Sequence, residues 1–203
     1  MITNYSLCKH LIREADVILF RKSNFPSVSW WIGLYSQSPY SHIGLAHWDK
    51  GELYCLEFRE FKGSRTYLMN DYIKEEENRI DIFRVCDKIK FTGTDPKDTI
   101  EKEFTPTIAK DITNYALELM AKYNKYGWQL IWKIWRTYLP FVRVWRNVKY
   151  DDSNGSIYVC STLVTQTYRK HYLDPVPFLA DEYTKPGDIA RSAILRRIFS
   201  ISV

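Results

Sequence analysis

The chain of 203 residues is 45% hydrophobic and 26% charged, which is ordinary for a globular protein and suits a single domain over residues 1–203. Its formal net charge of +5 suits anionic partners, but no recognised nucleic-acid-binding motif accompanies it, which argues against nucleic acid as a partner. No run approaches the roughly 18 apolar residues of a transmembrane helix, and residues 1–10 lack the apolar segment of a signal peptide. These patterns predict a cytoplasmic or peripheral protein.

Hydrophobic periodicity and turn residues predict an alternation of strands and helices along the chain. The expected strands are residues 16–20, 40–48, 53–58 and 80–85, with a hairpin turn at 49–52 and a further short element at 66–73. The expected helices are residues 5–14, 107–123 and 128–139, a helix beginning at Cys160, and a short helical start within 184–190. Residues 28–34 are a short helix or a loop, and residues 91–105 a loop. This order predicts an α+β domain with an antiparallel sheet and helices to one side.

Cys160 is the first candidate for chemistry. A turn-rich segment, 151–156, precedes it, and Leu163, Val164 and Thr167 follow at helical spacing, so Cys160 is expected near a helix N-terminus. Unpaired N–H groups and the positive end of the helix dipole favour a thiolate there. The four cysteines are sparse for a disulfide scaffold, so we expect reduced thiols. They contain no C-x-x-C pair that would indicate a zinc site, and we expect neither a metal site nor a cofactor.

A thiolate nucleophile needs a base, and four histidines are available. His10 and His171 lie in polar surroundings and read as surface residues. His42 and His47 share the expected strand 40–48, where their odd separation places them on opposite faces. His42 has Gly44 on its face, which leaves room for another group, whereas His47 shares its face with larger residues.

Glu57 is the candidate for orienting the base. It lies inside the apolar strand 53–58, where burial of a carboxylate is costly unless a partner binds it. If the hairpin turns at 49–52, Glu57 comes near the level of His42 to Ile43 and accepts a hydrogen bond from the imidazole. The alternative is an exposed Glu57 that pairs with Arg59 or a lysine.

The motif Ser41-His42-Ile43-Gly44, then Leu56-Glu57, then Tyr158-Val159-Cys160-Ser161-Thr162 resembles the circularly permuted branch of the NlpC-type papain-like superfamily. The YaeF/YiiX-type permuted amidases and hydrolases are the group it most resembles, over about residues 16–192. The resemblance implies a permuted papain-like fold and a cysteine hydrolase without a cofactor. It also implies Cys160 as nucleophile, His42 as general base and Glu57 as the orienting residue.

Such a site attacks an amide or ester carbonyl and passes through an acyl-enzyme, with the Cys160 backbone N–H as an oxyanion donor. The substrate is then a peptide, an isopeptide or a lipid acyl group, and the enzyme an amidase, peptidase or acyl hydrolase.

Residues 128–150 form an aromatic and basic segment that is an expected helical insertion in the domain. Trp128, Trp132 and Trp135 fall along one helical stripe. A core-facing helix explains this stripe, but so does a substrate-binding groove wall, or a surface that contacts a membrane or another protein.

A second hypothesis is that the protein is not an enzyme. On this view the papain-like scaffold serves binding or structure, for instance as a component of a virus particle.

Overall fold

The computed structural model describes residues 2–22, 38–59, 62–75, 79–92, 99–123, 160–177 and 179–202. Its strands are β1 (Ile2–Asn4), β2 (Val17–Arg21), β3 (Tyr40–Asp49), β4 (Glu52–Arg59), β5 (Gly63–Leu68), β6 (Ile80–Val85), β7 (Lys88–Thr92), β8 (Thr99–Glu103) and β9 (Leu195–Ser202). Its helices are α1 (Tyr5–Cys8), η1 (Lys9–Leu11), α3 (Met69–Glu75), α4 (Pro106–Lys122), α6 (Cys160–Lys170), η3 (Asp181–Tyr183) and α7 (Pro186–Ala190).

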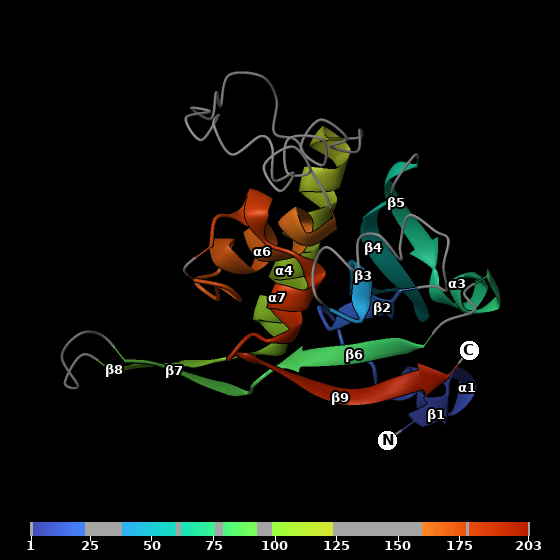
Figure 1. The fold of residues 1–203 in the computed structure, drawn as a ribbon, viewed down its shortest axis with the longest axis horizontal. Helices are drawn as coiled ribbons and strands as arrows, with labels where there is room; N and C mark the ends of the chain where they lie inside the picture. The colour runs from blue at the N-terminus through green and yellow to red at the C-terminus, as the bar shows by residue number, and fades with distance from the viewer. Residues whose placement is uncertain are drawn as a thin grey trace, which may run out of the picture.

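Within these residues, seven strands form one sheet in the order β1-β9-β6-β2-β3-β4-β5 (Figure 1). Every neighbouring pair is antiparallel except β1 and β9, which run parallel. The fold is therefore α+β with a mostly antiparallel sheet, as the sequence predicts. The ribbon formed by β7 and β8 extends away from this sheet (Figure 1), and β8 and the end of β7 are strand where the sequence predicts a loop over residues 91–105.

The β3–β4 hairpin turns where the sequence predicts it. Asp49 pairs with Glu52, and the two residues between them, Lys50 and Gly51, have φ of 48° and 82°. Positive φ at both central residues is the geometry of a type I′ turn, whose twist matches that of the strands. This turn fixes the register that brings β3 and β4 residues together.

Helices cover both faces of the sheet, not one. The larger apolar cluster joins α4 and α6 to one face and includes Ile43, Leu45, Leu56, Phe58 and Leu163. The second cluster covers the other face. It is built on Tyr5, Cys8, Met69 and Tyr72 of α1 and α3, together with sheet residues such as Ile18, Ala46 and Ile82.

The central strand β6 is buried along its whole length, although its alternation of polar and apolar residues predicts a half-buried strand. The polar positions explain the difference, since both are held in ion pairs. Arg84 contacts both carboxylate oxygens of Asp16, and Arg21 donates twice to one oxygen of Asp81. Buried charges are tolerated when they are paired in this way.

No helix in the described ranges combines the length and the apolarity needed to span a membrane.

Candidate functional site

His42 is the third residue of β3 and has a side chain that is 6% exposed. Its cross-strand neighbour on β2 is Phe20, and the two rings lie 5.4 Å apart. Imidazole Nε2 lies 2.5 Å from Oε2 of Glu57 on β4. The structure thus brings together the two residues that the sequence places on adjacent strands.

Glu57 is fully buried, which excludes the alternative of an exposed glutamate that pairs in solvent. The sequence predicts Glu57 near the level of His42 to Ile43, but the observed register differs slightly. Leu45 pairs with Leu56, so that Gly44 is the residue beside Glu57. His42 reaches the carboxylate diagonally across the hairpin, a distance that a long side chain spans.

The space beside Gly44 is filled. A Cβ at Gly44 would come 2.4 Å from Cys55 Sγ and 3.0 Å from the Leu56 carbonyl oxygen. The absence of a side chain at Gly44 therefore lets β4 pack closely, and the room that the sequence suggests is occupied by Cys55.

Two further residues bind the Glu57 carboxylate. Arg65 Nε donates to Oε1, and the Tyr72 hydroxyl donates to Oε2 at 3.0 Å. Burial raises the pKa of Glu57, but the charge and hydrogen bond of His42 and the charges of the neighbouring arginines outweigh burial and lower it. Glu57 is thus held as a carboxylate.

Arg65 and Tyr72 are not among the site residues that the sequence predicts. Arg65 lies directly opposite Glu57 in the β4–β5 ladder, and Tyr72 comes from α3. A signal existed in the sequence, since Lys62-Gly63-Ser64 marks a second turn after β4. The turn alone does not place Arg65, because only the strand register across it shows that Arg65 lies opposite Glu57.

Cys160 is the first residue of α6 and is 6% exposed. Its helix packs against β3 and β4, so that its start lies near the strands that carry His42 and Glu57. The next residue, Ser161, donates from Oγ to the carbonyl oxygen of Thr184 at 2.6 Å. That bond ties the start of α6 to the segment leading into α7.

Cys160 interacts with His42. Burial lowers the pKa of His42, but the charges of Glu57 and Cys160 outweigh burial and raise it to about 10. Among the described residues, no atom meets hydrogen-bond geometry at the buried Nδ1 of His42. We therefore take the thiol as close to the imidazole without being aligned on it, with Nδ1 as the ring nitrogen open to sulfur.

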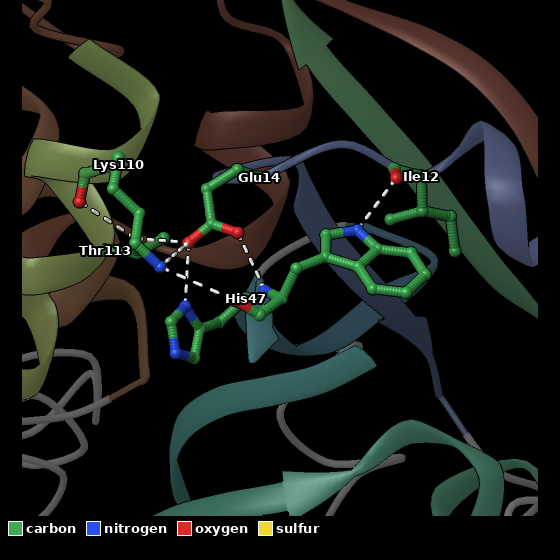
Figure 2. Close-up of polar contacts among 6 residues, drawn as sticks. Ile12, Glu14, His47, Lys110 and Thr113 are labelled. Carbon is green, nitrogen blue, oxygen red and sulfur yellow. Dashed lines mark hydrogen bonds and ion pairs between the residues drawn. The ribbon is translucent and has the colours of Figure 1, made fainter. Parts of the chain in front are cut away.

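His47, the second histidine of β3, has a different set of partners (Figure 2). Its Nδ1 lies 2.7 Å from Oε1 of Glu14, which also accepts from Thr113 on α4, while Glu14 Oε2 accepts from the Trp48 backbone N–H at 2.7 Å. Lys110 also approaches Oε1, at 3.5 Å. His47 therefore joins β3 to the chain before β2 and to α4, and it is not in the His42 site.

Glu57 and the Nε2 atom of His42 do not suit a metal ion. His42 Nε2 and both oxygens of Glu57 already have partners, and the guanidinium of Arg65 beside the carboxylate repels a cation. No group of three or more His, Cys, Asp or Glu side chains that could hold a metal occurs within the described segments.

A cavity of about 360 Å³ lies at the far end of β2 and β3 from His42, and its lining includes none of Cys160, His42 and Glu57. Its lining includes Asp16, Trp48 and the start of α4 at Thr105 and Pro106. Trp128, Trp132 and Trp135, predicted to bind substrate, lie outside the described residues, as does the rest of the expected insertion at 128–150.

Comparison with known proteins relates this fold to one solved structure in particular. The crystal structure of metalloprotein YiiX from Escherichia coli O157:H7, DUF1105, superposes with a TM-score of 0.58 at 14% sequence identity. The match covers 92% of this chain and 96% of that one, so the two share a fold over nearly their whole lengths. No family model matches the sequence, and no curated protein matches it significantly.

Proposed function

We propose that the chain is a cysteine-dependent hydrolase of amide or ester bonds, with Cys160 as nucleophile, His42 as general acid and base, and Glu57 as the orienting carboxylate. The observation that carries the proposal is the buried His42–Glu57 pair at 2.5 Å, whose imidazole also interacts with the cysteine that begins a helix. A nucleophile, a base within reach of it and a group that orients the base form the minimal set for acyl transfer.

The reaction begins with the proton on His42. Its pKa is raised to about 10, so the ring is an imidazolium at neutral pH, and the nucleophile is the thiolate form of Cys160. The sulfur attacks the substrate carbonyl, and the first-turn N–H groups of α6, which lack partners within the helix, are suited to stabilise the oxyanion.

His42 then donates its proton to the leaving amine or alcohol, which completes the acyl-enzyme. A water molecule gives a proton to His42 as it attacks the thioester, and the acid product leaves Cys160. Throughout, Glu57 accepts from Nε2 and keeps Nδ1 directed toward sulfur.

The finer fold assignment, a circularly permuted NlpC-type papain-like fold, is part of the proposal. Its support is the order of the elements, since the histidine strand β3 precedes the cysteine helix α6, together with the shared fold of YiiX. YiiX is described as a metalloprotein. Because the residues around His42 do not suit a metal, no step here uses one.

The proposed substrate is a peptide, an isopeptide or a lipid acyl group. The aromatic stripe of Trp128, Trp132 and Trp135 remains the predicted substrate-binding segment, and residues 128–150 the predicted contact with a membrane or a protein.

The test is the rate at which iodoacetamide labels each thiol of the folded protein at neutral pH, resolved by mass spectrometry. Cys86 is the internal control, because it is more exposed than Cys160 and faster labelling of Cys160 cannot then reflect access. We expect Cys160 to be labelled first and His42→Ala to slow it by at least roughly tenfold, the order of a lost general base.

If all four thiols react alike, the hydrolase proposal is wrong. If Cys160→Ala leaves binding to a stable partner intact and the wild type turns over neither acyl esters nor peptide amides, the non-catalytic scaffold is the better description.

A further inference from the structure

Glu57 is held by a second set of side chains that no step of the proposed reaction uses. Arg65 binds Oε1, and Tyr72 and His42 share Oε2. Arg65 is 15% exposed in its side chain and Tyr72 is 2% exposed, so both contacts lie away from bulk solvent. Contacts to a carboxylate in such surroundings are strong and directional.

The direction of the Tyr72 hydroxyl proton follows from its other partner. Arg59 donates to the same hydroxyl oxygen, and a guanidinium can only donate. The Tyr72 proton must therefore point to Glu57. The guanidinium carbons of Arg59 and Arg65 each lie 5.3 Å from the centre of the Tyr72 ring, which limits its rotation.

These contacts hold the carboxylate at both oxygens. Oε1 is engaged by a cation from β5, and Oε2 is engaged by a neutral hydroxyl from α3 together with His42. Without them, the carboxylate would be free to turn and to take up a proton, since it is fully buried.

We propose that Arg65 and Tyr72 are positioning residues of this site, which hold Glu57 ionised and turned so that His42 keeps its proton on Nε2 and presents Nδ1 to Cys160. The inference rests on the proposed function for its consequence in catalysis. The competing explanation is that Arg65 only neutralises a buried charge and so stabilises the fold.

The experiment uses two measurements on the full chain. The first is the iodoacetamide labelling rate of Cys160 at neutral pH. The second is the tautomer of His42, read from its ring nitrogen shifts by NMR above the pH at which the ring loses its charge. A purely structural role would change the melting temperature and leave both measurements as in the wild type.

The variants are Tyr72→Phe, which removes only the hydroxyl, Arg65→Met, Arg65→Lys and Glu57→Gln. Arg196→Met is the matched control, since Arg196 is exposed and pairs with Asp87 at 3.5 Å. Arg65→Met risks unfolding because it leaves Glu57 buried without its cation. The double variant Glu57→Gln/Arg65→Met removes both charges and provides the second test.

We expect Tyr72→Phe and Arg65→Met each to slow Cys160 labelling roughly tenfold, and to give a mixture of His42 tautomers where the wild type has the Nε2–H form, with Arg65→Lys in between. Since Arg65 acts through Glu57, the double variant should label no more slowly than Glu57→Gln alone. The control should match the wild type.

Failure of the two proposals can be told apart. If wild-type Cys160 is labelled quickly and the folded variants match it, the positioning role is overturned and the hydrolase proposal stands. If wild-type Cys160 is no faster than Cys86 but the tautomer still shifts in Tyr72→Phe, the hydrolase proposal falls and the positioning of His42 stands. If wild-type Cys160 is not labelled quickly and no variant shifts the His42 tautomer, both proposals are overturned.

Discussion

His42 carries its charge against the effect of burial. Burial alone lowers the pKa of an imidazole, yet Glu57 and Cys160 raise that of His42 to about 10. Because this value exceeds the ordinary 6.5, the protonated ring contributes stability that is fully present below about pH 6.5 and is lost as the pH rises toward 10.

We therefore expect the free energy of unfolding to fall more steeply between about pH 6.5 and 10 in the wild type than in His42→Gln, measured by urea denaturation. Lysines and tyrosines also titrate at the upper end, but they do so in both proteins. Parallel curves for the two proteins would contradict a raised pKa at His42.

Gly44 supports the site through close packing. In Gly44→Ala the new methyl group would meet Cys55 Sγ at 2.4 Å and the Leu56 carbonyl oxygen at 3.0 Å, so β3 and β4 must move apart beside Glu57. We expect a loss of about 1–3 kcal/mol in unfolding free energy, typical of overpacking. Adding Cys55→Ala should restore part of it; no recovery would mean that the clash with Cys55 is not the cause.

For single residues, the sequence indicates which residue types suit a catalytic site, but it does not give the strand register that places one residue opposite another. A cysteine at a helix start is common, and Cys160, His42 and Glu57 stand out in the sequence because Glu57 lies in an apolar strand and because the motifs around all three resemble one known family. Arg65 and Tyr72 are unremarkable until the β4–β5 ladder and α3 place them against Glu57.

Glu14 links helix α4 to strand β3 through its contacts with both elements (Figure 2). Burial raises the pKa of Glu14, but His47, Thr113 and the Trp48 N–H outweigh it and leave the pKa lowered. A lowered carboxyl pKa contributes stability that is present above the ordinary value of 4.5 and is lost as the pH falls through the folded pKa.

Glu14→Gln should therefore cost on the order of 1–3 kcal/mol near pH 7, as expected for hydrogen bonds to a charged group, and less below about pH 4. Thermal unfolding at both pH values measures this. Glu52→Gln is a matched control, because Glu52 is about half exposed in its salt bridge to Lys9. An equal loss at both pH values would rule out the charge of Glu14 as the source.

Elements were predictable where apolar periodicity is strong. Strands β2, β3 and β4 and helix α4 lie within one or two residues of expectation. The sequence predicts a loop at β8 and the end of β7 because residues 91–105 are polar and rich in turn residues. The β7–β8 ribbon pairs with itself outside the main sheet, so little apolar alternation is required of it.

For the molecule as a whole, β9 has the largest structural role that sequence analysis left unassigned. It lies between β1 and β6, and its Phe199 and Ile201 belong to the cluster under α1 and α3. Its sequence mixes Arg196 and Arg197 with apolar residues, and both arginines are exposed, so alternation does not reveal a central strand.

Deleting residues 195–203 should consequently abolish cooperative unfolding, since it opens β6 and exposes a buried cluster. Deleting residues 2–4 removes the edge strand β1, which pairs with β9, and the Asn4 cap of α1, and should leave a cooperative transition at a lower temperature. Calorimetry compares the two. A cooperative transition in the first deletion would show that β6 does not depend on β9.

The position of β9 also sets an order of events during synthesis. The ribosome makes β6 long before β9, and in that interval the apolar residues Ile80 and Ile82 belong to a strand with one unpaired edge. Exposed apolar edges of this kind recruit other chains. The nascent protein is therefore most prone to aggregation after its proposed catalytic residues have been made and before its last strand closes the sheet.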